Sequence, residues 1–308
     1  MVHIQENWIK MWYMLGDGEP VVTNMPGYPH VKNVTLGNCA YVLKQLSGDW
    51  QRRSFLEQVY ERLSSEKKVL IPLANRAGRY ITEVSGKAFL LFEQVLPVGS
   101  PPSLNWWGRT LHALHSVSAF WQRQTLVITP MVRSCEEMLA AAELQMGHRV
   151  AGEVRSLLQR LPREERLPVQ SVLNHGDPLS DNVMQRNDRF VLIDFDNARI
   201  FPKEYDWQRF LWGMAVNGGL TWKAFQQACG VDGPLCWKLM ATLYILDFTT
   251  TVSWLYLVSN DCHRADRWRQ AEERERFRSA LEAGRIQAMV DLLFKESEKV
   301  ENGLCEQS

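Results

Sequence analysis

An abrupt change in residue pattern near Gly99 constrains the fold of this chain more than any other feature. Before it, residues 1–98 contain short β-prone runs that Gly, Pro and Asn interrupt repeatedly, as in an antiparallel sheet. After it, residues 99–308 consist mostly of segments whose apolar residues recur at helical spacing. The sequence therefore predicts an α+β protein in two lobes, with a β-rich lobe over 1–98 and a mainly helical lobe over 99–308.

Five strands and one helix are expected in the first lobe. Residues 31–36 and 40–46 flank the turn Gly37-Asn38, a pattern that indicates a β-hairpin. Residues 50–63 carry apolar side chains at helical spacing, so we expect a helix there. The three remaining strand candidates are residues 69–73, 79–84 and 88–96.

The second lobe is expected to consist mostly of helices. Ser134 followed by Glu137 is a capping-box signal, and apolar residues continue at helical spacing as far as Leu157. Another helix is expected after Gly233. The charged run 265–278 places opposite charges four residues apart, as a solvated surface helix does.

The apolar segment 239–258 is long enough to cross a bilayer core, which takes ~20 residues. Asp247 lies in its middle among several Thr and Ser residues. A carboxylate at that depth costs about 2.5–3.5 kcal/mol on insertion scales. We therefore expect the segment to be a buried helix of a soluble protein.

The charge balance and the cysteines of the chain indicate which classes of partner it can bind and in which compartment it is expected. The chain has 35 Lys and Arg against 35 Asp and Glu, a balance that argues against binding to nucleic acids or anionic membranes. Its 6 cysteines are scattered and form no CxxC pair, so we expect reduced thiols. The N-terminal residues lack the apolar stretch of a signal peptide. A cytoplasmic protein is expected.

Residues that can carry chemistry are concentrated in the segment 171–207. It contains His-Gly-Asp at 175–177, then Asn182, and then an apolar run over 190–193 that leads into Asp-Phe-Asp at 194–196. A buried strand that ends in carboxylates places acidic oxygens at a sheet edge, where they can hold Mg²⁺ together with substrate phosphates. Phosphoryl transfer needs these groups: a carboxylate to orient the hydroxyl, and an amide and a carboxylate to hold the metal.

This segment resembles the aminoglycoside phosphotransferase family of kinase-like enzymes, which includes the choline kinases. The catalytic loop of that family typically reads His-Gly-Asp, four residues and Asn, and a strand ending in Asp-Phe/Trp-Asp follows. The resemblance implies a two-lobed protein-kinase-like α+β fold that uses ATP and Mg²⁺. It makes Asp177 the catalytic residue, and Asn182 and Asp194 the metal ligands.

The resemblance extends along most of the chain. Lys44 looks like the strand lysine that contacts the α- and β-phosphates of ATP, and Glu57 looks like its carboxylate partner on the next helix. Residues 90–99 resemble the hinge, which implies that the backbone from Glu93 to Val95 binds adenine. Residues 108–115 resemble the helix that opens the large lobe.

Three histidines are candidate functional groups. His112 and His115 are three residues apart on an expected helix, a spacing that could bind a metal, but no third ligand is suggested nearby. We favour a packing or hydrogen-bonding role for His115. His175 is expected to support the catalytic loop through backbone hydrogen bonds.

The acceptor pocket is expected on the helix that contains Asp247. Tyr244, Asp247, Thr251 and Trp254 are three to four residues apart and share one helix face. A buried carboxylate is costly unless it is paired. Two partners are plausible: a basic or backbone group of the protein, or a substrate ammonium flanked by the rings of Tyr244 and Trp254.

These observations together favour an ATP-dependent, Mg²⁺-assisted phosphotransferase that acts on a hydroxyl of a small molecule. An aminoglycoside-like antibiotic and an amino alcohol or other metabolite are both candidate acceptors. The alternative from another class is a catalytically silent kinase-fold protein that binds nucleotide as a scaffold.

Overall fold

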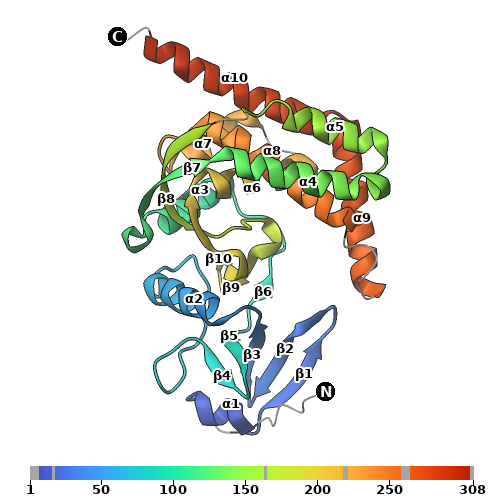
Figure 1. Cartoon of the computed structure of the whole chain (residues 1–308). Helices are drawn as coiled ribbons and strands as arrows, with labels where there is room; N and C mark the ends of the chain where they lie inside the picture. The colour runs from blue at the N-terminus through green and yellow to red at the C-terminus, as the bar shows by residue number, and fades with distance from the viewer. Residues whose placement is uncertain (1–6, 16–17, 163–164, 218–220, 258–263, 306–308) are drawn as a thin grey trace. The chain divides into compact units, whose positions relative to one another are not determined.

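The computed structural model describes residues 7–15, 18–162, 165–217, 221–257 and 264–305 (Figure 1). By its contacts the chain divides into two compact units. The first comprises residues 1–102 and 180–198, and the second comprises 103–179 and 199–308. The segment 180–198, expected in the second lobe, belongs to the first unit.

The first unit contains a five-stranded antiparallel sheet. In spatial order its strands are β1 (Val21–Met25), β2 (Tyr28–Leu36), β3 (Cys39–Leu46), β5 (Lys87–Glu93) and β4 (Thr82–Val84). The predicted hairpin is confirmed, because β2 pairs with β3 as far as Leu36 opposite Cys39. Gly37 adopts φ 57° in the turn, a conformation that favours glycine.

The helix predicted over 50–63 is confirmed. The helix α2 (Trp50–Leu63) begins after Asp49, whose side chain accepts a hydrogen bond from Arg52 N, as an N-cap does. Its buried residues recur at helical spacing and are Leu56, Val59, Tyr60 and Leu63. A short additional helix, α1 (Asn7–Trp12), was not predicted, and Trp8 and Ile9 join the core of this unit.

Three of the predicted strands need correction. Residues 69–73 form no strand and contribute an isolated bridge between Val69 and Leu192. The strand expected over 79–84 is restricted to Thr82–Val84. The strand expected over 88–96 ends at Glu93, and Leu96 belongs to a short strand of another sheet. The fifth strand of the sheet is β1, which the sequence analysis missed.

The segment 180–198 forms a small sheet in the first unit. Its strands β9 (Val183–Arg186) and β10 (Arg189–Leu192) form a hairpin, and β9 also pairs with β6 (Leu96–Pro97). The 3₁₀ turns η2 (Ser180–Asn182) and η3 (Phe195–Asn197) flank this hairpin. Asn182 and Asp194 therefore lie at neighbouring ends of one hairpin.

The second unit combines helices with a three-stranded antiparallel sheet. The sheet has the order β11 (Arg199–Pro202), β8 (Arg166–Asn174) and β7 (Gln122–Val127). The helices are α3 (Leu104–His115), α4 (Ile128–Met146), α5 (His148–Leu158), α6 (Glu204–Asn217), α7 (Trp222–Gly230), α8 (Trp237–Leu257), α9 (Arg264–Glu282) and α10 (Arg285–Cys305), with the 3₁₀ turn η1 (Ser118–Phe120).

Helix boundaries in this unit differ from the expectation in one place. The helix predicted from Ser134 begins earlier, at Ile128, and is interrupted at Gly147. Gly147 has φ 83°, a left-handed backbone conformation that ends an α-helix. The strand β7 was also missed.

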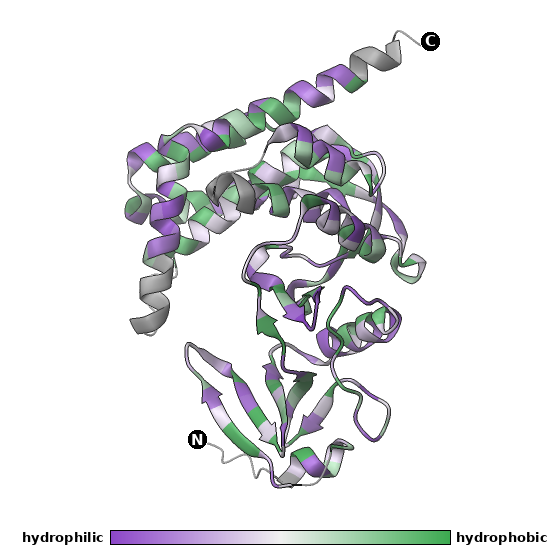
Figure 2. Cartoon of the chain, turned by 180° about the vertical axis from the view of Figure 1, so that it is seen from behind, coloured by the Kyte–Doolittle hydropathy of each residue, from purple (hydrophilic) through white to green (hydrophobic). Residues whose placement is uncertain are grey.

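The apolar segment with Asp247 forms α8, which contacts α4, α6 and α10 and is buried over most of its length. This confirms the expected buried helix, apart from Val258, which lies outside the described residues. None of the described helices is long and apolar enough to span a membrane. Figure 2 shows polar and apolar stretches alternating along α10, whose Ile286, Val290 and Leu293 are fully buried.

Candidate active site

In the first unit, Lys44 lies against two carboxylates. Lys44 is on β3, and its Nζ is 2.7 Å from Asp194 Oδ1 and 2.9 Å from Asp196 Oδ2. Burial opposes the positive charge of Lys44, but the two neighbouring carboxylates outweigh this effect and raise its pKa. The lysine is therefore a fixed cation beside the two acids.

The backbone at Asp194 directs this carboxylate into place. Asp194 adopts φ 66° and ψ 68°, and its side chain accepts a hydrogen bond from Asp196 N at the start of η3. The carbonyl oxygen of Asn182 accepts a hydrogen bond from Ile193 N at 2.9 Å. These bonds hold the end of the β10 strand and the η2 turn together.

The acidic residues of this turn fit a magnesium ion. Oδ1 of Asp196 is buried and has no hydrogen-bond partner among the described residues. No three His, Cys, Asp or Glu side chains in the described ranges could hold a metal by themselves. Mg²⁺ is usually bound by one or two carboxylates, with phosphates and water completing its six oxygens. Asp194 and Asp196, near Asn182, match that donor set, and the sequence analysis had not assigned Asp196.

Arg52, at the beginning of α2, fastens the same turn and was not predicted. Its guanidinium donates hydrogen bonds to the carbonyl oxygens of Asp196 and Ala198, each at 2.5 Å, and of Phe195 at 3.3 Å. One side chain thus binds three carbonyl groups of the segment that carries the two acids.

The expected pair of Lys44 and Glu57 is wrong. Glu57 instead accepts hydrogen bonds from the backbone N–H groups of Tyr80 at 2.7 Å and Ile81 at 2.8 Å. These two N–H groups precede β4, and the carboxylate satisfies both of them. The carboxylate partners of Lys44 come from the Asp-Phe-Asp turn.

The two hinge residues lie where β5 ends. Glu93 is the last residue of β5 and forms an ion pair with Arg186 on β9. Val95 is half-buried just before β6. Gln94 N donates to Ala40 O at 3.0 Å, so the backbone here is fixed against β3. Adenine binding by Glu93 and Val95 stays a prediction.

In the second unit, Asp177 is connected to Asp247 through an arginine. Arg209, on α6, donates from Nη2 to Asp177 Oδ1 and from Nη1 to Asp247 Oδ2, each at 2.8 Å. Tyr205 donates its hydroxyl to Asp247 Oδ1 at 3.4 Å. Burial and the neighbouring Asp247 charge raise the pKa of Tyr205, which keeps its hydroxyl protonated. Arg209 was not predicted as a site residue.

These contacts provide one of the two partners considered for Asp247. Arg209, a basic group of the protein, pairs with Asp247 beside Asp177. Binding of a substrate ammonium by Asp247 stays a prediction. The two aromatic residues of the expected stripe differ in environment, since Tyr244 is 0% exposed and Trp254 is 47% exposed. Contact of Tyr244 or Trp254 with a substrate stays a prediction.

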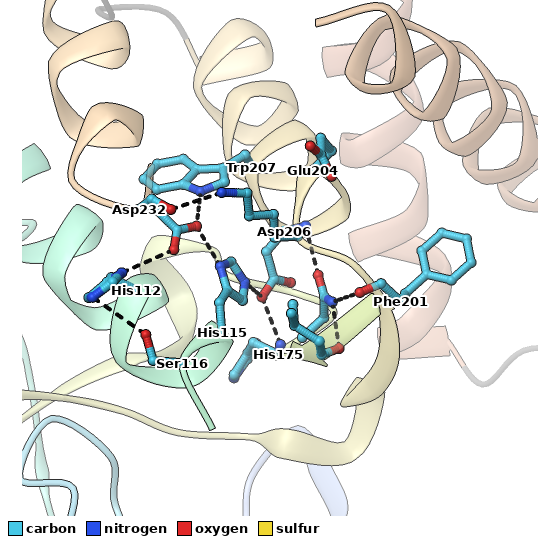
Figure 3. Close-up of polar contacts among 12 residues, drawn as sticks. His112, His115, Ser116, His175, Phe201, Glu204, Asp206, Trp207 and Asp232 are labelled. Atoms are coloured by element: carbon cyan, nitrogen blue, oxygen red, sulfur yellow. Dashed lines mark hydrogen bonds and ion pairs between the residues drawn. The ribbon is translucent and has the colours of Figure 1, made fainter. Parts of the chain in front are cut away.

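A buried carboxylate, that of Asp206, holds the backbone of the loop around His175 (Figure 3). Asp206 accepts hydrogen bonds from the backbone N–H groups of His175 and Gly176, each at 2.8 Å. His175 in turn accepts a hydrogen bond at Nδ1 from Asp177 N at 3.3 Å. The expected supporting role of His175 is confirmed.

His115 connects Asp206 to a second buried carboxylate (Figure 3). Its Nε2 is 3.2 Å from Asp206 Oδ2, and its Nδ1 is 2.5 Å from Asp232 Oδ2, which also accepts a bond from Trp207 Nε1. Burial by itself would lower the pKa of His115, but the two carboxylates raise it to about 9. His115 is therefore a buried cation with a hydrogen-bonding role, as favoured from the sequence.

Comparison with models of protein families assigns the chain to one family. The model of the phosphotransferase enzyme family matches residues 34–233, which include Lys44, Asp177, Asn182 and Asp194. No curated protein matches the sequence.

Solved structures of low sequence identity share the fold. Spectinomycin phosphotransferase APH(9)-Ia, in complex with ADP and spectinomycin, is 13% identical over 91% of this chain and 97% of its own, with a TM-score of 0.62. An aminoglycoside phosphotransferase from Alicyclobacillus acidocaldarius is 14% identical over 97% and 98%, also at 0.62. Choline kinase LicA from Streptococcus pneumoniae is 16% identical over 85% and 93%, at 0.56. The chain has a kinase-like α+β fold and belongs to the phosphotransferase enzyme family.

Proposed function

We propose that the protein transfers the γ-phosphoryl group of ATP, with the assistance of Mg²⁺, to a hydroxyl of a small molecule. The contact between Lys44 and the carboxylates of Asp194 and Asp196 carries this proposal. It brings a cation for phosphate oxygens together with the hard oxygen ligands that Mg²⁺ prefers.

The candidate site residues of the first unit have separate roles in this proposal. Lys44 binds phosphate oxygens of the nucleotide, and the backbone between Glu93 and Val95 binds adenine. Asp194 and Asp196, with Asn182, would hold Mg²⁺. When bound, the ion neutralises charge that develops on the transferred phosphoryl group. Glu57 shapes the loop before β4 rather than contacting the nucleotide.

The second unit supplies the acceptor side of the reaction. Asp177 accepts a hydrogen bond from the acceptor hydroxyl and directs its oxygen at the γ-phosphorus. Asp206 fixes the backbone of this loop by binding the N–H groups of His175 and Gly176. Positioning of the reacting groups supplies most of the catalysis in phosphoryl transfer.

The acceptor is proposed to be an aminoglycoside-like antibiotic or an amino alcohol. Structures with the same fold include the spectinomycin and choline enzymes and an amicoumacin kinase in complex with AMP-PNP, Ca²⁺ and its ligand. We place the enzyme in the cytoplasm, where ATP is available. The free thiols of Cys39, Cys135, Cys229 and Cys236 fit a reducing compartment.

A screen of acceptors tests the proposal. Purified protein is supplied with ATP and Mg²⁺ and with aminoglycosides, choline, ethanolamine and other amino alcohols, and ADP release is followed by a coupled assay. We expect acceptor-dependent ADP release by the wild-type protein and its loss in Asp177→Asn. Nucleotide binding without phosphate transfer to any hydroxyl compound would instead support a silent scaffold.

A further inference from the structure

Arg209 is an unusual neighbour for a catalytic carboxylate, because it is a nearly buried cation. Its side chain is 14% exposed, and it makes 2.8 Å contacts with both Asp177 and Asp247. The guanidinium carbon lies 4.7 Å from the ring centre of Trp212, one turn further along α6. Its Nε is buried without a hydrogen-bond partner in the described part of the chain.

Burying Arg209 with two carboxylates costs free energy that a purely structural contact could avoid. Removing charged groups from water costs several kcal/mol per ion, and apolar residues of similar volume often stabilise a fold equally well. The two carboxylates hold the guanidinium by charge-assisted hydrogen bonds, and burial does not outweigh them, so the pKa of Arg209 is raised. Arg209 is thus a permanent cation held in one place by Asp247 and by the Trp212 ring.

We infer that Arg209 is a positioning residue for Asp177, and that Asp247 acts by holding Arg209 rather than by binding an ammonium group of the acceptor. The inference rests on the proposed function, in which Asp177 orients the acceptor hydroxyl. A guanidinium hydrogen bond to Oδ1 fixes the rotation of the Asp177 carboxylate, so its second oxygen has a defined direction.

The hydrogen bonds connect Asp247 to Asp177 through Arg209. Tyr205 and Arg209 both donate to Asp247, and only Arg209 also donates to Asp177. An effect of Asp247 on turnover therefore passes through Arg209. If Asp247 instead bound a substrate ammonium, its loss would weaken acceptor binding and leave the chemical step nearly unchanged.

Steady-state kinetics with the best acceptor from the screen separates the two roles. Arg209→Met should lower kcat about 10- to 100-fold, and Arg209→Lys less, while the KM for ATP changes little. Asp247→Asn should also lower kcat, with little change in the KM for the acceptor. The double variant should be no slower than Arg209→Met, because Asp247 has no effect without Arg209.

Arg160→Met is the matched control. Arg160 is also an arginine of the second unit with a carboxylate and a ring as partners: it donates to Asp291 Oδ1 at 2.6 Å, and its guanidinium carbon lies 4.9 Å from the ring centre of Phe294. These partners are not among the residues of the proposed network, so turnover in this variant should equal that of wild type. If Arg209→Met fails to fold, Arg209→Lys and Asp247→Asn carry the test.

Two results would overturn the inference. One is an Asp247→Asn variant with raised acceptor KM and unchanged kcat, and the other is additive losses in the double variant. Crystal structures of wild type and Asp247→Asn give a readout that does not depend on turnover. We expect the Asp177 carboxylate to lose its single orientation in the variant. A retained orientation would contradict the positioning role of Arg209. An inactive wild type would instead count against the proposed function.

Discussion

The ammonium group of Lys44 lies 2.7 Å from the carboxylate of Asp194, which is 150 residues further along the chain. This contact connects the sheet that would hold the nucleotide to the turn that would hold the metal. Asp194 and Asp196 share the lysine, so a change at Lys44 should affect nucleotide binding and turnover together.

Lys44→Met is expected to raise the KM for ATP and to lower kcat. The substitution removes the cation proposed for the phosphates but retains most of the apolar length of the side chain. Initial rates over a range of ATP concentrations measure both constants. Lys10→Met, which changes a lysine of α1 away from Asp194 and Asp196, is the control and should behave as wild type. Unchanged constants in Lys44→Met would contradict the assignment.

Arg52→Met should weaken the binding of Mg²⁺-nucleotide. Without three hydrogen bonds to its carbonyl groups, the turn with Asp194 and Asp196 is less rigidly positioned, and a positioned ligand set binds Mg²⁺ more tightly than a loose one. Titration of nucleotide binding with Mg²⁺ should show a several-fold higher midpoint.

Arg53→Met is a matched control for this experiment, since Arg53 is the next residue of α2 and pairs with exposed Glu83. Its Mg²⁺ midpoint should equal that of wild type. Equal midpoints in Arg52→Met and Arg53→Met would show that the carbonyl contacts of Arg52 do not support the metal ligands.

His115 should make stability depend on pH. Its pKa is raised to about 9 in the folded chain, whereas an unfolded histidine has a pKa of about 6.5. Because protonated His115 is favoured in the folded chain, its contribution to the free energy of unfolding is fully present below about pH 6.5. That contribution is lost as the pH rises through about 9. The difference corresponds to about 3 kcal/mol.

Urea unfolding of wild type and His115→Gln between pH 6 and pH 10 measures this contribution. The difference in stability between the two proteins should be largest at pH 6 and should shrink toward pH 10. Comparing the two proteins removes the contributions of other titrating groups. A difference that is constant over this range would mean that His115 is not a buried cation.

Local patterns predicted the parts of the fold that local forces determine. The hairpin around Gly37 and the helix α2 follow from a turn and from helical spacing, and both agree with the structure. The apolar run 69–73 forms no strand, because its hydrogen bonds are irregular. Leu70 N binds Leu192 O and Leu73 N binds Leu91 O, and periodicity does not reveal such distant partners.

One motif predicts part of the candidate site, whereas contacts that depend on packing have no such signal. Asp177, Asn182 and Asp194 come from that motif, and their roles stay predictions. The contacts of Glu57 depend on the loop at Tyr80 and Ile81, which no local pattern indicates. Arg52 and Arg209 were missed for the same reason, because their partners lie up to 146 residues away in the chain.

The most direct test of the central claim follows the phosphoryl group itself. Wild type and Asp177→Asn are incubated with γ-labelled ATP, Mg²⁺ and the best acceptor, and label in the acceptor is measured. We predict transfer of label to a hydroxyl by wild type and a loss of about 10²–10⁴ in rate in Asp177→Asn, with Mg²⁺-dependent nucleotide binding retained. Equal transfer by both proteins, or no transfer to any acceptor, would contradict the account.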